Sequence, residues 1–167
     1  MTEQSSSRKS LGIIIAVLVL AGIGGGVWWW LNREKTPESN VDWPKVYALN
    51  NEAIGWMDQF KYQNAAKLFA EVRKLAPEWF PGRINHAIAL LNDAGGISPG
   101  DPREKEKKPL FSESLKILHQ VIHDPKAGAV EKAYGHFCSG VIYKQNDNLV
   151  KLKEHMEQVT KLDPKAP

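Results

Sequence analysis

The chain has 167 residues, of which 25% are charged and 43% hydrophobic, so it accommodates one modest globular domain and some extra segments. Its net charge of +3 is small, and its Lys and Arg residues are scattered among Asp and Glu, which does not favour nucleic-acid binding. A single cysteine, Cys138, excludes an intrachain disulfide and a cysteine-rich zinc site.

The first segment with a clear physical signature is an apolar run from Leu11 to Leu31, which contains no Asp, Glu, Lys or Arg. As a helix it would span roughly 31 Å, about the thickness of the apolar core of a bilayer. Tryptophans at 28–30 lie near its end, where an aromatic belt meets the headgroups. We therefore expect a tail at residues 1–10 and a transmembrane helix at residues 11–31. The alternative is a cleaved signal peptide, whose apolar region would be shorter and followed by an A-x-A-like site.

The orientation of this run in a membrane is predicted from the lengths of the segments on its two sides. Basic residues lie close to it on both sides, so their distribution is nearly balanced. A short N-terminal tail before a long polar segment is typical of a signal anchor. We therefore expect a single-pass membrane protein with a cytoplasmic N-terminus and a periplasmic or extracytoplasmic C-terminal domain. Gly22 and Gly26 form a GxxxG pair, which is a weak indication that two anchors dimerise in the lipid bilayer.

Residues 32–43 are polar, include Pro37 and have no periodic apolar pattern, so they are expected to form a tether. The stretch Asn32–Asp42 can extend to at most about 40 Å. The tether would therefore hold the following domain close to the membrane surface.

After the tether the sequence predicts helices, and no strand-like alternation occurs. Asp42 can cap a helix that begins near Pro44, because proline is tolerated in a first turn. Apolar residues then recur at helical spacing in six segments. These segments are residues 44–60, 61–77, 82–92, 111–125, 131–145 and 148–164.

Two of these segments share one spacing of small and apolar residues that ends in proline. The same intervals connect Tyr62, Ala65, Phe69, Val72, Leu75 and Pro77 in one segment and Leu149, Leu152, Met156, Val159, Leu162 and Pro164 in the other. This spacing resembles helix B of a tetratricopeptide repeat (TPR), a helix–turn–helix unit of about 34 residues. At the family's Gly and Tyr positions in helix A, the three repeats have Ala53 and Trp56, Ala87 and Leu90, and Gly140 and Tyr143.

The resemblance implies an all-α fold in which residues 44–164 form about three TPR helix–turn–helix pairs of a short solenoid. It is strong in the first and third repeats and degraded in the second, where Ser114 stands near the family's small residue of helix B. Pro77 and Pro164 are farther apart than two repeats require, and much of the intervening sequence is rich in Gly, Pro and charge. We therefore expect an inserted loop at residues 93–110.

A narrower resemblance covers residues 50–93. This stretch is similar to repeats near the N-terminus of certain bacterial membrane-anchored proteins, which carry later FG-GAP (VCBS-type) repeats and an ASPIC/UnbV domain. None of those later domains is present in this chain.

The sequence favours neither catalysis nor a bound cofactor. His119 and His123 have the i, i+4 spacing of metal ligands, but no HExxH motif accompanies them, so we expect no metal. Cys138 is expected to be a buried structural thiol rather than a nucleophile. The charged run 101–109 is expected to be a solvated loop, the alternative being a contact with headgroups or acidic partners.

Binding is the activity that the resemblance implies. In the family, helix A residues line a concave face that contacts a peptide or protein partner. The corresponding residues are Asn50, Ile54, Met57, Ile84, Asn85, Ile88, Phe137 and Val141. Asparagine amides can hydrogen-bond a peptide backbone while the apolar residues bury side chains. A carboxylate clamp would need lysine in place of Asn50, and the alternative to a groove is that these apolar residues pack against one another or against a further domain.

Two function classes follow from these expectations. The first is a non-enzymatic, membrane-anchored scaffold that binds a protein or peptide outside the cytoplasmic membrane. The alternative is the targeting and interaction segment of a larger multidomain protein, or an assembly helper for envelope or cytochrome proteins.

Overall fold

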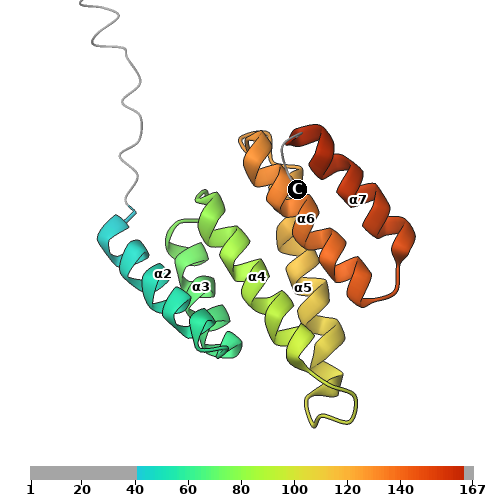
Figure 1. Ribbon diagram of the computed structural model, residues 1–167. Coiled ribbons are helices and arrows are strands. Elements are labelled where there is room, and N and C mark those ends of the chain that lie inside the picture. The colour runs from blue at the N-terminus through green and yellow to red at the C-terminus, as the bar shows by residue number, and fades with distance from the viewer. Residues whose placement is uncertain (1–40, 164–167) are drawn as a thin grey trace, which may run out of the picture. The chain divides into compact units, whose positions relative to one another are not determined.

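The computed structural model describes residues 41–163, and this part of the chain is helical and contains no strand. Its helices are α2 (Trp43–Asp58), α3 (Tyr62–Leu75), α4 (Phe80–Gly96), α5 (Glu104–Ile122), α6 (Ala129–Gln145) and α7 (Leu149–Leu162) (Figure 1). The anchor expected at 11–31 lies outside the described residues. Within the described part, no helix is both long and apolar enough to cross a membrane.

Polar side chains cap the N-termini of α2 and α7. The Asp42 carboxylate accepts a hydrogen bond of 3.1 Å from the Lys45 amide, and Pro44 occupies the first turn of α2. The Asn148 side chain accepts one of 3.0 Å from the Lys151 amide at the start of α7. Such caps satisfy amides that have no partner inside the helix. The expected cap at Asp42 is therefore confirmed.

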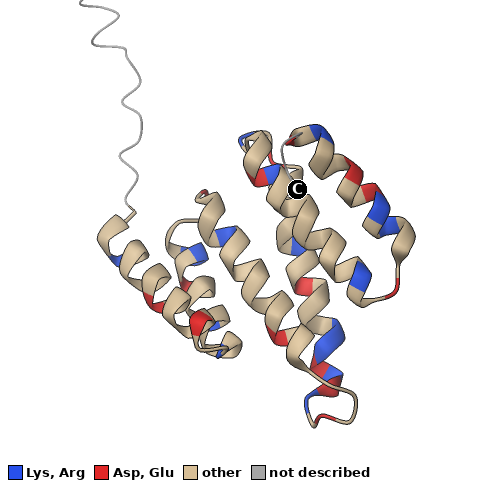
Figure 2. Cartoon of the chain, in the orientation of Figure 1, with Lys and Arg blue, Asp and Glu red and all other residues tan. Residues whose placement is uncertain are grey.

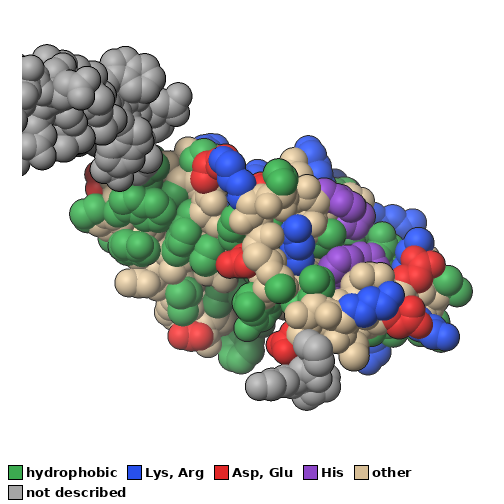
Figure 3. Space-filling model, turned by 90° about the horizontal axis from the view of Figure 1, so that it is seen from above, with side chains coloured by type: hydrophobic (Ala, Val, Ile, Leu, Met, Phe, Trp, Pro, Cys, Tyr) green, Lys and Arg blue, Asp and Glu red, His purple; other side chains and the backbone are tan. Residues whose placement is uncertain are grey.

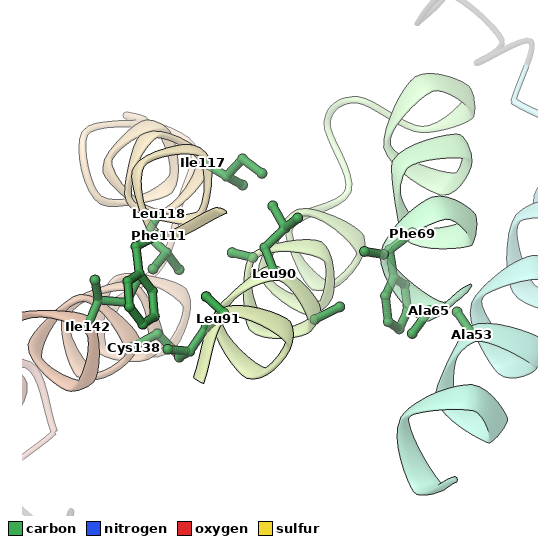
Figure 4. Close-up of a cluster of buried hydrophobic side chains, with 14 residues drawn as sticks. Ala53, Ala65, Phe69, Leu90, Leu91, Phe111, Ile117, Leu118, Cys138 and Ile142 are labelled. Atoms are coloured by element: carbon green, nitrogen blue, oxygen red, sulfur yellow. The ribbon is translucent and has the colours of Figure 1, made fainter. Parts of the chain in front are cut away.

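The helices pack as three antiparallel hairpins, α2 with α3, α4 with α5, and α6 with α7. Each helix also packs against the next along the chain, and α4 additionally contacts α6. Helices α2, α4 and α6 form one layer, and α3 and α5 lie in the other (Figures 1 and 4). The first helix of every hairpin therefore belongs to the same layer.

The main hydrophobic core lies between these two layers (Figure 4). Small side chains occur where the two helices of a hairpin meet. Ala53 and Ala65 are fully buried between α2 and α3. The Ser114 hydroxyl of α5 donates a 2.7 Å hydrogen bond to the Ala87 carbonyl of α4. Small residues thus permit close helix approach in both hairpins, as the spacing of the sequence predicts.

In the third hairpin the small residue lies on the first helix. A side chain added at Gly140 of α6 would overlap the end of Met156 and come within 3.4 Å of Leu152, both on α7. Gly140 stands at the position of Ala53, and Leu152 at that of Ala65. The third hairpin therefore accommodates a larger residue on its second helix because the first helix has none.

The turns of the first and third hairpins have the same conformation. In each turn one non-glycine residue adopts a left-handed φ, 58° at Phe60 and 55° at Asp147. The following amide then donates back to a carbonyl near the end of the first helix. These bonds run from Lys61 to Trp56 and from Asn148 to Tyr143, and both are 2.9 Å long. Trp56 and Tyr143 are the residues that the sequence places at one repeat position, so the structural and sequence registers agree.

The hairpin of α4 and α5 differs from the other two, and the expected loop at 93–110 is too long. Helix α4 continues to Gly96 and α5 begins at Glu104, so only residues 97–103 connect them. The Arg103 guanidinium donates to both carboxylate oxygens of Asp93, over 3.0 and 2.8 Å. This ion pair closes the connection, and most residues of the expected loop belong to the two helices instead.

Candidate partner-binding surface

Large apolar side chains are exposed on the two outer helices of the α2, α4 and α6 layer. Tyr47 and Ile54 of α2 are 50% and 41% exposed, and Tyr134 and Phe137 of α6 are 55% and 50% exposed. Tyr47 and Ile54 are two helical turns apart, and Tyr134 and Phe137 are one turn apart, so each pair shares one side of its helix. We refer to Tyr47, Ile54, Tyr134 and Phe137 as the apolar face.

Three further apolar residues that were expected to bind a partner are half-buried. Met57, Ile88 and Val141 are partly exposed and pack against the main core. They lie on α2, α4 and α6, the same three helices. Of the residues expected to bind a partner, Ile54, Met57, Ile88, Phe137 and Val141 are thus accessible at least in part.

Ile84 is not accessible in this way. Only 8% of its surface is exposed, and it packs with Val121 and Ala127 in a small separate cluster. The side chain therefore belongs to the contact of α4 with the end of α5 and the segment that follows. Its place among the expected partner-binding residues is corrected accordingly.

The two asparagines expected to bind peptide are bonded to each other. Asn85 of α4 donates through Nδ2 to Oδ1 of Asn50 in α2, over 3.1 Å. Asn50 is 7% exposed, whereas Asn85 is half-buried. The pair therefore connects neighbouring hairpins, and it is Asn85 that retains access to solvent.

Charge is scarce along α4, which lies between α2 and α6 (Figure 2). Arg83 and Asp93 are the only Lys, Arg, Asp or Glu residues in this helix. Arg83 pairs with Asp124 over 3.0 Å, and Asp93 pairs with Arg103 over 2.8 Å. The middle of the surface therefore presents apolar and amide groups, and it suits a ligand recognised by burial rather than by ion pairing.

Tyr47 and Tyr134 were not among the partner-binding residues expected from the sequence. The residue offset that relates Trp56 to Tyr143 also relates Tyr47 to Tyr134, so the two tyrosines occupy one repeat position. Both are large, exposed and on the first helix of their hairpins. Extending the repeat alignment toward the helix starts would have found them.

Two buried ionisable groups of the described domain, Cys138 and His86, have pKa values shifted by burial. Burial raises the pKa of the Cys138 thiol to about 11, so it stays protonated at neutral pH, and a buried structural thiol is what the sequence predicts. Burial, followed by the charge of Arg73, lowers the pKa of His86 to about 4. The Nδ1 atom of His86 is buried and has no hydrogen-bond partner. His86 is therefore neutral at physiological pH, and its side chain is on the buried side of α4.

The histidine pair noted in the sequence belongs to a larger group. His119 of α5 and His123, the residue that follows this helix, have ring centroids 6.3 Å apart, and His136 of α6 and His155 of α7 lie beside them. The histidines gather toward the α7 end of the domain, while hydrophobic side chains predominate toward the α2 end (Figure 3). No group of three or more His, Cys, Asp or Glu residues within 41–163 is arranged to hold a metal ion.

Comparisons of the chain with known protein families, with curated proteins and with solved structures found no match.

Proposed function

We propose that residues 44–164 form a TPR-like repeat domain that binds a protein partner through the apolar face. The repeat assignment is supported by the matching turns at Phe60 and Asp147 and by the small residues inside each hairpin. The turn residues Phe60 and Asp147 are separated by the same interval as Ala53 and Gly140, so the first and third hairpins share one register.

The observation that carries the binding proposal is the exposure of Tyr47, Ile54, Tyr134 and Phe137 on one layer of helices. Exposed groups of large apolar side chains usually mark a binding surface, and tyrosine and other aromatic residues are enriched where partners bind most tightly. Both charged side chains of α4 are held in ion pairs, which indicates that the apolar face binds an uncharged surface. The partner is a segment of another protein with large apolar side chains, whose backbone can bond the accessible part of Asn85.

We further propose that residues 11–31 anchor this domain in a membrane, with the domain outside the cytoplasm. The support is the uncharged run itself, which is as long as a bilayer core is thick. The measurement is the intact mass of the protein after extraction from membranes. An unprocessed chain that resists alkaline extraction is expected, and a mature N-terminus beyond residue 20 would contradict the anchor.

Site-specific photocrosslinking in the native membrane tests the binding surface. A photoreactive phenylalanine analogue replaces Tyr134 on α6 in one variant and the exposed Glu71 on α3 in the other. Both variants keep the full chain. We expect a discrete crosslinked partner from position 134 and none from position 71, because only the first lies on the apolar face. Adducts of equal yield from both positions, or from position 71 alone, would reject the proposed surface.

A further inference from the structure

Four histidines from three helices meet at the α6–α7 end of the domain. His136 Nδ1 of α6 and His155 Nδ1 of α7 are 3.1 Å apart. The His155 ring also stacks on that of His119 from α5, with centroids 6.2 Å apart and planes 4° from parallel. Tyr143 of α6 contacts His155 as well, with ring centroids 5.3 Å apart. His155 of α7 thus contacts both α5 and α6.

The short distance between the two Nδ1 atoms restricts their protonation. A neutral imidazole has one N–H and one lone pair, so at neutral pH one Nδ1–H can donate to the other Nδ1. When both rings are protonated, each Nδ1 carries a hydrogen and neither keeps a lone pair that could accept one. Two N–H groups cannot face each other at 3.1 Å, and two positive rings repel. Full protonation therefore requires the His136 and His155 rings to separate.

Helix α7 is the helix best able to move in response. It contributes no buried residue to the described domain, in contrast to each of the other five helices. Its half-buried Leu152 and Met156 pack over Gly140 of α6. Segments with few buried apolar contacts open at low free-energy cost. Separation of the two rings can therefore be achieved by displacing α7 from α6.

We propose that the histidine cluster is an acid-sensitive latch, which holds α7 against α5 and α6 at neutral pH and releases it when His136 and His155 are both protonated. Release would uncover the side of α6 that carries Gly140. The packing of α2, α3, α4 and α5 against one another does not involve α7, so we expect the change to be confined to the last hairpin and to the contact of His119 with His155.

The surroundings of the cluster support this sign of the pH dependence. Burial, and then the neighbouring His155, His123 and His119, lower the pKa of His136 to about 4. Burial also lowers the pKa of His119 and of His155. The charge of Lys151 on α7 acts in the same direction on His155, while Glu154 opposes it. Docked rings therefore resist protonation, and the released rings accept protons at an ordinary pKa near 6.5.

The difference in pKa between the docked and the released rings determines the pH range in which α7 is released. Above about pH 6.5 both states are neutral, and docking is at full strength. As the pH falls from about 6.5 toward 4, the released state binds more protons than the docked state, so release becomes more favourable. After discounting for the partial exposure of the His136 ring, we expect the equilibrium to shift by about tenfold between pH 7.5 and pH 5.

Hydrogen–deuterium exchange of the purified full-length chain, with a metal chelator present, measures this release. Exchange rates at pH 7.5 and pH 5 are corrected for the intrinsic pH dependence of amide exchange. We expect the protection of α7 amides to fall about tenfold at pH 5, and the control is a double variant rather than the amides of α4, because His86 on α4 also lowers global stability at this pH. The double variant His136→Asn, His155→Asn places non-titrating amides near the two Nδ1 positions, and its α7 protection should not change with pH.

The single variant His155→Asn provides a second test if the double variant folds poorly, as judged by circular dichroism at pH 7.5. It leaves one titrating ring in the pair, and the pH dependence of α7 should be reduced. The latch is contradicted by equal α7 protection at the two pH values in the unmodified chain. It is also contradicted by an undiminished pH effect in the variants.

Discussion

At the scale of single residues, the Asn50–Asn85 bond shows what the sequence could and could not indicate. Repeat positions predicted that both residues lie on first helices of hairpins, and both do. Their mutual hydrogen bond could not be predicted, because it depends on the distance between α2 and α4, which the packing of the whole domain determines. Burial of Asn50 makes it a connection between hairpins rather than a free donor.

This bond predicts that Asn50 matters for stability as well as for binding. Asn50→Ala should lower the free energy of unfolding by about 1–2 kcal/mol, because Asn85 loses its acceptor in a half-buried position. The measurement is denaturant-induced unfolding followed by circular dichroism. Asn51→Ala is the matched control, since Asn51 is the exposed neighbour on α2 and its replacement should change stability by less than about 0.5 kcal/mol. Equal effects of the two changes would contradict the structural role of the bond.

At the scale of helices and turns, local patterns predicted most of the fold. The apolar periodicity placed all six helices, because it reflects the side of each helix that is buried. The connection of α4 and α5 was predicted too long, because Gly95, Gly96 and Pro109 suggested a loop. Gly95 and Gly96 end α4, and Pro109 lies inside α5. The ion pair of Arg103 and Asp93 joins residues whose contact no local pattern reveals.

The approach of α4 to α3 can be tested with two glycines. A Cβ atom at Gly82 of α4 would lie 2.8 Å from the ring of Trp79 and 2.8 Å from Val72 of α3, so Gly82→Ala should destabilise the domain. Gly55 of α2 has no atom within 4 Å of such a Cβ. Gly55→Ala should therefore stabilise the helix by about 0.5–1 kcal/mol. Thermal melts of both variants measure the difference, and shifts of the same sign would contradict the close packing at Gly82.

At the scale of the whole molecule, the sequence predicted the layer that carries the candidate surface but only part of the surface itself. Ile54 and Phe137 were found, whereas Ile84 proved to be buried and Tyr47 and Tyr134 were missed. The histidine cluster could be predicted only for His119 and His123, whose spacing is local. His136 and His155 join them through the packing of α6 and α7 against α5, which brings together residues far apart in the chain.

Stability of the whole domain should depend on pH through His86. Its pKa is about 4 in the folded protein and near 6.5 when exposed, so the unfolded state binds the extra proton first as the pH falls. The free energy of unfolding should therefore decrease from about pH 6.5 toward pH 4, by at most about 3 kcal/mol from this residue. His86→Leu should remove this part of the loss. Unfolding curves across this range measure it, and parallel pH profiles for the two proteins would contradict the assignment to His86.

The central claim, that the apolar face binds a protein partner, is tested most directly by titrating the purified partner from the crosslinking experiment. One double variant, Ile54→Ser with Phe137→Ser, alters the face. The other, Leu149→Ser with Val150→Ser, removes two apolar side chains of α7 that are more exposed than Ile54 and Phe137. We expect the first to weaken binding by about tenfold or more, a loss of about 1.4 kcal/mol, and the second to leave the affinity within about twofold. Equal affinities for the unmodified chain and the first variant would contradict the claim.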